Sequence, residues 1–333
     1  MYNFALIGCG NISNRHAENI SRVGKLIAVC DVVKTKADSL AKKYNAAAYY
    51  NIDELLVNET GIHIVVVCTP NGLHPEHSVK ALQRGKHVLC EKPLSISVED
   101  AVRMVATADH CQRKLFVVKQ NRYNEPVQYV KKLLDENQLG KIYSFQLNCF
   151  WNRPQQYYSN SWHGTKNLDG GVLFTQFSHF IDLLYWFLGD VDTVQGFNHN
   201  YGKRSHFELE DTGVAVLKMK NGQIGTLNYT INSYSKNLEG SLSLFGEKGS
   251  VKIGGQYLNT LEWHEVENIE KPVFPVARPA NDYGFYQGSM SNHHKVYDEL
   301  IRSLKGNGSL LEARNAVSTI EIIEKIYAAT TEA

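Results

Sequence analysis

Residues 87 to 97, HVLCEKPLSIS, place Lys92 directly after a short apolar run and before a proline. The run HVLC is typical of a buried strand, so Lys92 is expected at a strand's carboxyl end. Pro93 fixes its own φ angle and biases Lys92 toward extended backbone, which holds the side chain in one direction. Such a lysine can remove a proton if its pKa falls from about 10.4 toward neutrality. The alternative is a solvated charge, because lysine is usually exposed.

A second chemical signal is the segment Gly8-Cys-Gly10-Asn-Ile-Ser13, which follows the apolar run FALIG and precedes a helical pattern. Glycines there allow a tight turn and close approach of a pyrophosphate to a helix N-terminus. Ser13 replaces the third glycine of the fingerprint and is small enough for helix packing. Asp31 follows Gly10 by 21 residues, close to the spacing of an acid that binds the adenosine ribose. An acid there repels a 2′-phosphate, so we predict NAD rather than NADP.

Thr69, Pro70 and Asn71 form a polar turn after the apolar run IVVVC. They are expected at the same sheet edge as the glycine segment, where they could contact a dinucleotide. An equally good interpretation is a plain turn, with Asn71 or Gly72 capping the next helix.

Residues 4 to 119 alternate between continuous apolar runs and segments with helical spacing. Continuous apolar runs are typical of parallel strands that are buried on both faces. We therefore predict an α/β fold with an N-terminal Rossmann domain over 1–119, built on a doubly wound parallel sheet. If HVLC is the strand after the topological switch, Lys92 lies at the crevice where such sheets bind ligands.

The remainder of the chain has the alternating pattern of antiparallel strands, with KNG and EKG as hairpin turns. Helices are expected at about 127–136, 174–188, 291–305 and 312–329. This pattern predicts a C-terminal α+β domain over 120–290 with an open, mostly antiparallel sheet. The helices in 291–333 are expected to pack back near the domain junction.

Composition excludes several partners. The 35 Lys and Arg residues nearly balance the 34 Asp and Glu residues, so the net charge of +1 offers no footprint for nucleic acid or an anionic membrane surface. No apolar stretch approaches the ~20 residues of a membrane helix, and the N-terminus begins with a strand pattern instead of a leader, so we expect a cytoplasmic protein.

The six cysteines lack the CxxC spacing of simple zinc or redox sites. Cys30, Cys68 and Cys90 each close an expected strand, and Cys9 lies in the glycine segment. We expect all four to pack as small buried hydrophobes, without a metal. The alternative is a metal or redox cluster at one sheet edge.

The segment CEKPLSIS and the glycine segment together resemble the Gfo/Idh/MocA oxidoreductase family, whose EKP motif supplies an active-site lysine. Residues 168–186, LDGGVLFTQFSHFIDLLYW, are similar to the family's GGG…DxGxHxxDLL segment, in which a helical histidine faces the nicotinamide and substrate. The resemblance assigns that role to His179, with Asp182 one turn further. Thr175 stands where many members have a catalytic aspartate, which leaves Lys92 and His179 to handle protons. The alternative for His179 is a hydrogen-bonded core histidine.

Residues 118 to 191 are similar to the branch that oxidises C3 of UDP-N-acetyl-glucosaminuronic acid during lipopolysaccharide O-antigen synthesis. His163 departs from that branch, which has an arginine after the tryptophan, so the contacts of that arginine are in doubt here. The resemblance implies these cofactor-binding residues: Gly8, Gly10, Asn11, Ile12, Asp31, Thr69, Pro70, Asn71, His74, Glu91, Lys92, Asn121, Arg122 and Trp162. It implies these substrate-binding residues: Lys92, Arg122, Tyr123, Arg153, Thr165, Lys166, Thr175, Gln176 and His179.

On this resemblance Lys92 removes the hydroxyl proton as hydride leaves for NAD, and His179 hydrogen-bonds the same oxygen. Arg122, Arg153 and Lys166 are candidates to bind a diphosphate or sugar carboxylate, since paired donors suit such groups; equally, they could be solvated charges. One face of the C-terminal sheet is expected to line the substrate cleft and the other to build a homodimer or homotetramer. The branch also implies 2-oxoglutarate as a hydride acceptor that reoxidises the cofactor.

Two other functions remain open. The first is a dehydrogenase for another polyol, such as inositol or a free sugar. The second is an NAD-binding regulator without catalysis, although a pure sensor has no reason to keep both Lys92 and His179.

Overall fold

The computed structural model describes residues 1–159, 161–275, 279–284, 286–308 and 311–332. Its contacts divide the chain into two compact units. The first comprises residues 1–119, 167–169 and 293–320, and the second comprises residues 120–166, 170–292 and 321–333.

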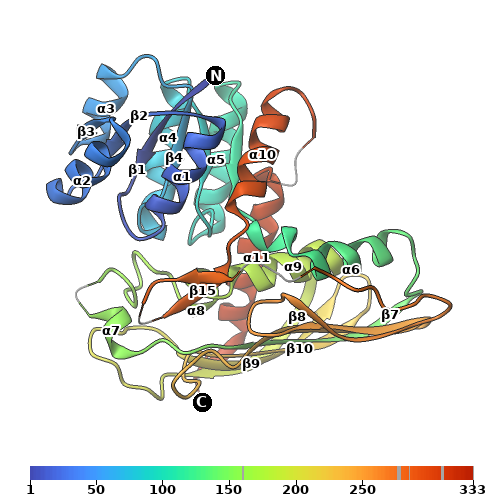
Figure 1. Ribbon diagram of the computed structural model, residues 1–333. Coiled ribbons are helices and arrows are strands. Elements are labelled where there is room, and N and C mark those ends of the chain that lie inside the picture. The colour runs from blue at the N-terminus through green and yellow to red at the C-terminus, as the bar shows by residue number, and fades with distance from the viewer. Residues whose placement is uncertain (160, 276–278, 285, 309–310, 333) are drawn as a thin grey trace. The chain divides into compact units, whose positions relative to one another are not determined.

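The first unit contains a six-stranded parallel sheet in the order β3-β2-β1-β4-β5-β6, with helices packed around it (Figure 1). The strands are β1 Tyr2–Ile7, β2 Gly24–Cys30, β3 Ala47–Tyr49, β4 Ile64–Val67, β5 His87–Cys90 and β6 Leu115–Val117. The prediction of a doubly wound Rossmann sheet is therefore confirmed. The strand order reverses between β1 and β4, so β5, which precedes Lys92, is the second strand beyond the switch rather than the first.

The helices of this unit are α1 Ser13–Val23, α2 Lys34–Tyr44, α3 Ile52–Asn58, α4 His74–Gln83, α5 Val98–His110 and α10 His293–Leu304, with a 3₁₀ turn at Asn71–Leu73. The sequence pattern missed β3 and α3, because both are too short to show a periodicity. Asn51 marks the start of α3, where its side chain accepts the N–H groups of Asp53 and Glu54. Helix α10 packs against α1 although about 280 residues separate them in the sequence.

The second unit contains an eight-stranded sheet in the order β13-β12-β11-β7-β10-β9-β8-β16. The strands are β7 Ile142–Phe150, β8 Val191–His199, β9 Thr212–Met219, β10 Ile224–Thr230, β11 Glu239–Gly246, β12 Gly249–Gly254, β13 Thr260–Val266 and β16 Thr330–Glu332, with a separate hairpin of β14 Ala280–Asp282 and β15 Gln287–Met290. Only β7–β10 and β8–β16 pair in parallel among the described strands of this sheet. The predicted antiparallel sheet is thus confirmed, including the hairpin turns KNG between β9 and β10 and EKG between β11 and β12.

The helices of the second unit are α6 Glu125–Asp135, α7 Gln155–Tyr158, α8 Val172–Thr175 and α9 Ser178–Leu188, with a 3₁₀ turn, η2, at Gln120–Tyr123; α11 Arg314–Ala329 begins in the first unit and ends in the second. Helices α6 and α9 lie on the same side of the sheet, where they contact β12 and β7 (Figure 1). None of the helices in the described residues combines the length and apolar character that a bilayer crossing requires.

The helix expected at 174–188 is two helices, so that prediction was wrong in its bounds. Phe177 leaves helical geometry with φ −116° and ψ 5°, and its N–H reaches back to the carbonyl of Val172 at 3.3 Å. The apolar periodicity continues across the break because Phe177 and Phe180 both pack on Trp151. As a result His179 lies in the first turn of α9.

Candidate active site

The glycine segment forms a turn that is closed on one side and open on the other. Gly8 has φ +92°, and a Cβ added there would lie 2.5 Å from the carbonyl oxygen of Cys68. A Cβ on Gly10 would meet nothing within 4 Å. Ser13, which replaces the third glycine, is 1% exposed and donates its hydroxyl to the Gly10 carbonyl at 2.6 Å. These residues fit the pyrophosphate of a dinucleotide, which needs open space beside the turn at the start of α1.

Asp31 lies at the end of β2, where its carboxylate supports the glycine turn. Its Oδ2 accepts the N–H of Cys9 at 2.7 Å, and its Oδ1 accepts the N–H of Val33 at 2.8 Å. Each carboxylate oxygen has a second lone pair, and the side chain is half-buried, so ribose hydroxyls can still donate to it. Lys34 directs its ammonium over the ring of Tyr50, 5.1 Å from the centroid. A carboxylate that can accept ribose hydroxyls at this position suits NAD, which has no 2′-phosphate.

The polar residues after β4 are held by the protein itself. The Asn71 side chain donates to the carbonyl of Asp169 at 2.9 Å and caps neither the 3₁₀ turn nor α4, so the capping interpretation was wrong. The hydroxyl of Thr69 contacts Nδ1 of His77 at 3.0 Å. His74, predicted to bind the cofactor, is 1% exposed, and its ring nitrogens face the carbonyls of Pro93 at 2.7 Å and Thr69 at 2.9 Å. It therefore links the end of β4 to the residue after Lys92.

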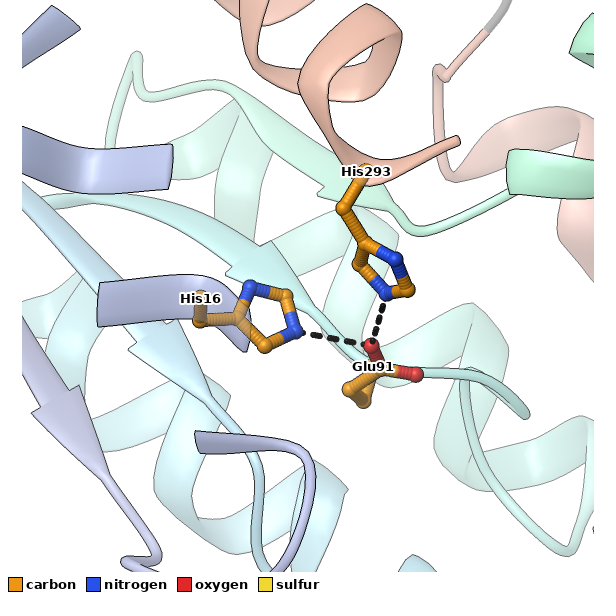
Figure 2. A group of neighbouring side chains, drawn as sticks. All are labelled: His16, Glu91 and His293. Carbon is orange, nitrogen blue, oxygen red and sulfur yellow. Dashed lines mark hydrogen bonds and ion pairs between the residues drawn. The ribbon is translucent and has the colours of Figure 1, made fainter. Parts of the chain in front are cut away.

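Lys92 follows β5 and is half-buried. Its backbone N–H donates to Oε2 of Glu91 at 3.0 Å. The other oxygen, Oε1, lies 2.8 Å from Nε2 of His16 and 3.5 Å from Nε2 of His293, so both rings point at one carboxylate (Figure 2). Burial alone would raise the pKa of Glu91, but the two imidazoles outweigh it and hold that pKa well below its usual range. Glu91 is thus an anion whose contacts fix the backbone that carries Lys92.

The same three residues are a group that could hold a metal ion, with their donor atoms within 4.8 Å of one another. The hydroxyl of Tyr297 lies 2.9 Å from Nδ1 of His16 and orients that ring. The hydrogen bond between His16 and Glu91, together with the 3.5 Å contact of His293, accounts for the burial of the charge, so we treat the group as a support for Lys92.

The cysteines of the sheet edge are free thiols; Cys9, Cys30 and Cys90 are buried and Cys68 is half-buried. Burial, followed by the nearby Asp31 carboxylate, raises the pKa of Cys9 to about 12 and that of Cys30 to about 11. Burial also raises the pKa of Cys68 and Cys90. Thiols that stay protonated are poor metal ligands and poor nucleophiles, which favours the packing interpretation.

His179 is 3% exposed in the first turn of α9, and Thr175 is 8% exposed at the end of α8. Asp182, one turn after His179, forms a bidentate ion pair with Arg122, which also lies 4.8 Å from the Trp186 ring. Arg122 was a candidate to bind an anionic substrate group. Its charge is instead compensated by Asp182.

Arg153 and Gln176 form a separate network in the second unit. Nε of Arg153 donates to Oε1 of Gln176 at 2.7 Å, and Nε2 of Gln176 donates to the hydroxyl of Tyr157 at 2.9 Å. Both Arg153 and Gln176 are buried. The structure therefore brings together two of the predicted substrate residues and adds Tyr157, which the sequence reasoning missed.

The loop before α8 carries three more predicted residues. Trp162 stacks on His163 with ring centroids 3.9 Å apart, and Thr165 donates its hydroxyl to the Trp162 carbonyl at 2.8 Å. His163 also packs against Tyr157, so this histidine fills an aromatic stack where the resembling branch has an arginine. Lys166 is exposed, and its backbone N–H donates to Glu208.

Asn121 and Tyr123 belong to η2. Asn121 is 1% exposed, and neither atom of its side-chain amide has a hydrogen-bond partner among the described residues. Such a group costs free energy unless a ligand pairs with it, so Asn121 fits a ligand-binding role.

A cavity of about 740 Å³ in the second unit is lined by residues between Gln256 and Met290, mainly from β13, β14 and the chain that joins them. None of the predicted site residues lines it. We therefore do not assign the predicted chemistry to this cavity.

Comparison with known proteins gives matches in both units. Residues 2–119 match the Gfo/Idh/MocA family described as an oxidoreductase family with an NAD-binding Rossmann fold, and residues 127–252 match the Gfo/Idh/MocA C-terminal domain. Among curated proteins, glucose-6-phosphate 3-dehydrogenase of Bacillus subtilis is 32% identical over 198 residues, which are 58% of this chain and 55% of that protein. The aligned part thus spans little more than half of that relative.

Two solved structures are similar over nearly the whole chain. The WlbA dehydrogenase from Bordetella pertussis, in complex with NADH and UDP-GlcNAcA, has a TM-score of 0.88 and 33% identity over 98% of this chain and 96% of that chain. The WlbA dehydrogenase from Chromobacterium violaceum, in complex with the same two ligands, has a TM-score of 0.88 and 34% identity over 98% of this chain and 93% of that chain. The similarity to these two structures therefore extends over both units of this chain.

Proposed function

This chain belongs to the Gfo/Idh/MocA oxidoreductase family, which uses NAD, and we propose that it oxidises the C3 hydroxyl of UDP-N-acetyl-glucosaminuronic acid to a ketone. The observation that carries the proposal is 33–34% identity, across both units, with two dehydrogenases whose structures hold UDP-GlcNAcA. The curated relative that acts at position 3 of glucose 6-phosphate supports oxidation at the same carbon.

The proposed chemistry needs a proton acceptor at the sugar hydroxyl. Bound NAD⁺ would supply an acceptor for the hydride of C3. The step requires Lys92 to be neutral when the substrate binds, so that it can remove the hydroxyl proton. Its backbone is fixed by Glu91, to which its N–H donates at 3.0 Å. His179 hydrogen-bonds the same oxygen and stabilises the developing carbonyl. Thr175 replaces a carboxylate in this set, so the proton passes to Lys92 alone. The proposal requires that Lys92 and His179 reach one hydroxyl.

A second candidate is the oxidation of another sugar at C3. The 32% identity with glucose-6-phosphate 3-dehydrogenase favours it, although that identity covers 58% of this chain, whereas the 33–34% identity with the UDP-GlcNAcA-bound enzymes covers 98%. A regulator without catalysis has no such support, since the chain belongs to a family of oxidoreductases.

The wider context is also proposed. A UDP-linked 3-keto sugar acid suits lipopolysaccharide O-antigen synthesis in the cytoplasm, with 2-oxoglutarate as the acceptor that returns bound NADH to NAD⁺. A homodimer or homotetramer is supported by the exposed apolar side chains of Phe197, Val214, Val216 and Ile224 on three neighbouring strands, β8, β9 and β10. Contiguous exposed apolar side chains often mark protein interfaces.

The experiment is a substrate panel. Purified protein is mixed with UDP-GlcNAcA, UDP-GlcNAc, glucose 6-phosphate and myo-inositol, with NAD⁺ and with or without 2-oxoglutarate, and nicotinamide absorbance and the sugar product's mass are followed. We expect turnover of UDP-GlcNAcA with loss of two mass units. Turnover of glucose 6-phosphate or inositol without turnover of UDP-GlcNAcA would overturn the proposal.

A further inference from the structure

The side chain of Arg153 is a buried cation whose hydrogen-bond partners are all neutral. It is 2% exposed. Its Nε donates to Gln176, and its Nη1 donates to the carbonyl of Asn152 at 2.6 Å and to Oδ1 of Asn237 at 3.3 Å. Nη2 donates to none of the described residues. One edge of the guanidinium therefore lacks an acceptor.

Aromatic rings enclose the same guanidinium. The ring centroids of Trp151, Tyr157 and Tyr286 lie 4.8, 5.5 and 5.2 Å from its central carbon. Aromatic faces attract a cation and hold the guanidinium in place, but they bring no compensating charge. Burial lowers the pKa of Arg153, yet arginine keeps its proton at any working pH. The positive charge remains, uncompensated by the described residues.

Two other arginines of the second unit, the buried Arg122 and the half-buried Arg204, differ from Arg153. Arg122 is paired with Asp182 in the bidentate geometry, and Arg204 lies 3.0 Å from Asp211. No carboxylate of the described residues lies within ion-pair distance of Arg153. A buried charge without a counter-charge destabilises the fold. We therefore expect the buried arginine without a carboxylate partner to bind an anion that comes from outside the protein.

The position of Arg153 relates it to the proposed chemistry. Its partner Gln176 precedes His179 by three residues, in the break between α8 and α9. We propose that Arg153 binds the carboxylate of a uronic acid sugar and so makes the protein selective for sugar acids; this inference rests on the proposed function.

A carboxylate fits this site better than a diphosphate. One guanidinium balances one negative charge, and the remaining partners of Arg153 are amides, a carbonyl and rings. A diphosphate carries at least two charges and would need a second cation. Arg204, whose Nε donates to the Arg153 carbonyl at 3.2 Å, is already neutralised by Asp211. Carboxylate and guanidinium are also both planar, so they can pair along one edge.

The test compares UDP-GlcNAcA with UDP-GlcNAc, which has a neutral hydroxymethyl group in place of the carboxylate. Calorimetric affinities for NADH-loaded protein, which cannot oxidise the sugar, are measured for the wild type, for Arg153→Met and for Gln176→Glu, which adds an internal carboxylate beside the guanidinium. We expect the wild type to favour the acid by about 10²-fold or more, and both variants to lose this preference while their affinity for UDP-GlcNAc stays within about 3-fold.

Lys248→Met, which removes an exposed positive charge from the same unit, is the matched control and should retain the wild-type preference. Arg153→Met should melt no lower than the wild type, because it removes an uncompensated buried charge. If Arg153→Met fails to fold, the proposal is tested by the preference of Gln176→Glu for UDP-GlcNAcA over UDP-GlcNAc. Variants that keep the preference for the acid, or that lose affinity for both sugars equally, overturn the proposal.

Failure of the proposed function is a separate result. If the wild type binds neither UDP-sugar, that function fails, and the arginine is then tested with glucuronate against glucose in thermal unfolding. Stabilisation by glucuronate that disappears in Arg153→Met supports the carboxylate site. Equal stabilisation of wild type and variant, or of neither, overturns it.

Discussion

Arg122 and Asp182 form a bidentate ion pair in the interior of the second unit, with Nε to Oδ2 at 2.7 Å and Nη2 to Oδ1 at 2.8 Å. Their side chains are only 2% and 7% exposed. The pair ties η2 to α9, the helix that carries His179 one turn before Asp182. It therefore orients the first turn of α9 as well as neutralising Arg122.

Loss of one partner should be costly. Asp182→Asn is expected to lower the free energy of unfolding by about 3–5 kcal/mol, because it leaves the buried Arg122 charge without a counter-charge. Urea denaturation measures the change. The double variant Arg122→Met, Asp182→Leu should lose less than the sum of the single effects. Asp100→Asn, which breaks the exposed pair with Arg103, is the control and should cost under about 1 kcal/mol. A loss for Asp182→Asn no larger than the control's would contradict the buried pair.

Acid should destabilise the protein in two steps. Burial lowers the pKa of both His74 and His293, so the unfolded chain binds more protons than the folded chain once the pH falls below about 6.5. The free energy of unfolding should therefore fall between pH 7 and pH 5.5. Glu91 has a depressed pKa, so its contribution is present above about pH 4.3 and is lost at lower pH.

The role of histidine in this acid destabilisation is tested by the slope of the unfolding free energy against pH, because a substitution also changes the stability at every pH. His293→Asn should flatten the dependence of the unfolding free energy on pH between 7 and 5.5. His110→Asn, which removes an exposed histidine, should leave the slope unchanged. If the slope for His293→Asn equals that of the wild type, His293 does not contribute to the loss of stability between pH 7 and pH 5.5.

Local patterns predicted the parts of the site that depend on nearby residues. The glycine turn and Asp31 could be predicted because a strand, a turn and a helix fix the backbone around them within about 30 residues. The position of Lys92 followed from β5 in the same way. The break between α8 and α9 was missed because Phe177 and Phe180 keep helical spacing across it.

Contacts between distant segments could not be predicted from one sequence. Glu91 was expected at the cofactor, but its carboxylate meets His16 and His293, which lie 75 residues before it and 202 residues after it. The sequence also presented Arg122 and Arg153 as equivalent cations. Only the fold shows that Asp182 compensates the first and that rings and amides surround the second. Such pairings depend on how helices and strands pack, which periodicity does not encode.

Asp31 is expected to select NAD. Asp31→Asn keeps an oxygen that can accept the N–H of Cys9 but removes the charge that repels a 2′-phosphate. The preference for NAD over NADP should fall by about 10-fold or more, through weaker NAD binding and stronger NADP binding, as measured by fluorescence titration. Asp38→Asn, on the exposed side of α2, is the control and should keep the wild-type ratio. Wild-type protein with equal affinities for the two cofactors would show that Asp31 does not discriminate.

Lys92 is expected to act as the base. Lys92→Ala should bind NAD and fold nearly as the wild type does. The hydrogen bonds that hold the glycine turn, from Cys9 to Asp31, from Val33 to Asp31 and from Ser13 to Gly10, do not involve the Lys92 side chain. Its turnover number at saturating substrate should fall by about 10²–10⁴-fold, the usual contribution of a positioned base. Lys114→Ala removes an exposed lysine of the same unit and should keep full turnover.

Two further variants separate proton removal from a general need for positive charge at this position. Lys92→Arg should not restore turnover, because arginine retains its proton at any working pH. His179→Ala should also lower turnover, and the double variant should lose less than the product of the single effects, since two groups that act on one oxygen are not additive. Full turnover by folded Lys92→Ala under saturating substrate would mean that the EKP segment is only a strand end. Strictly multiplicative losses would mean that Lys92 and His179 do not share a hydroxyl.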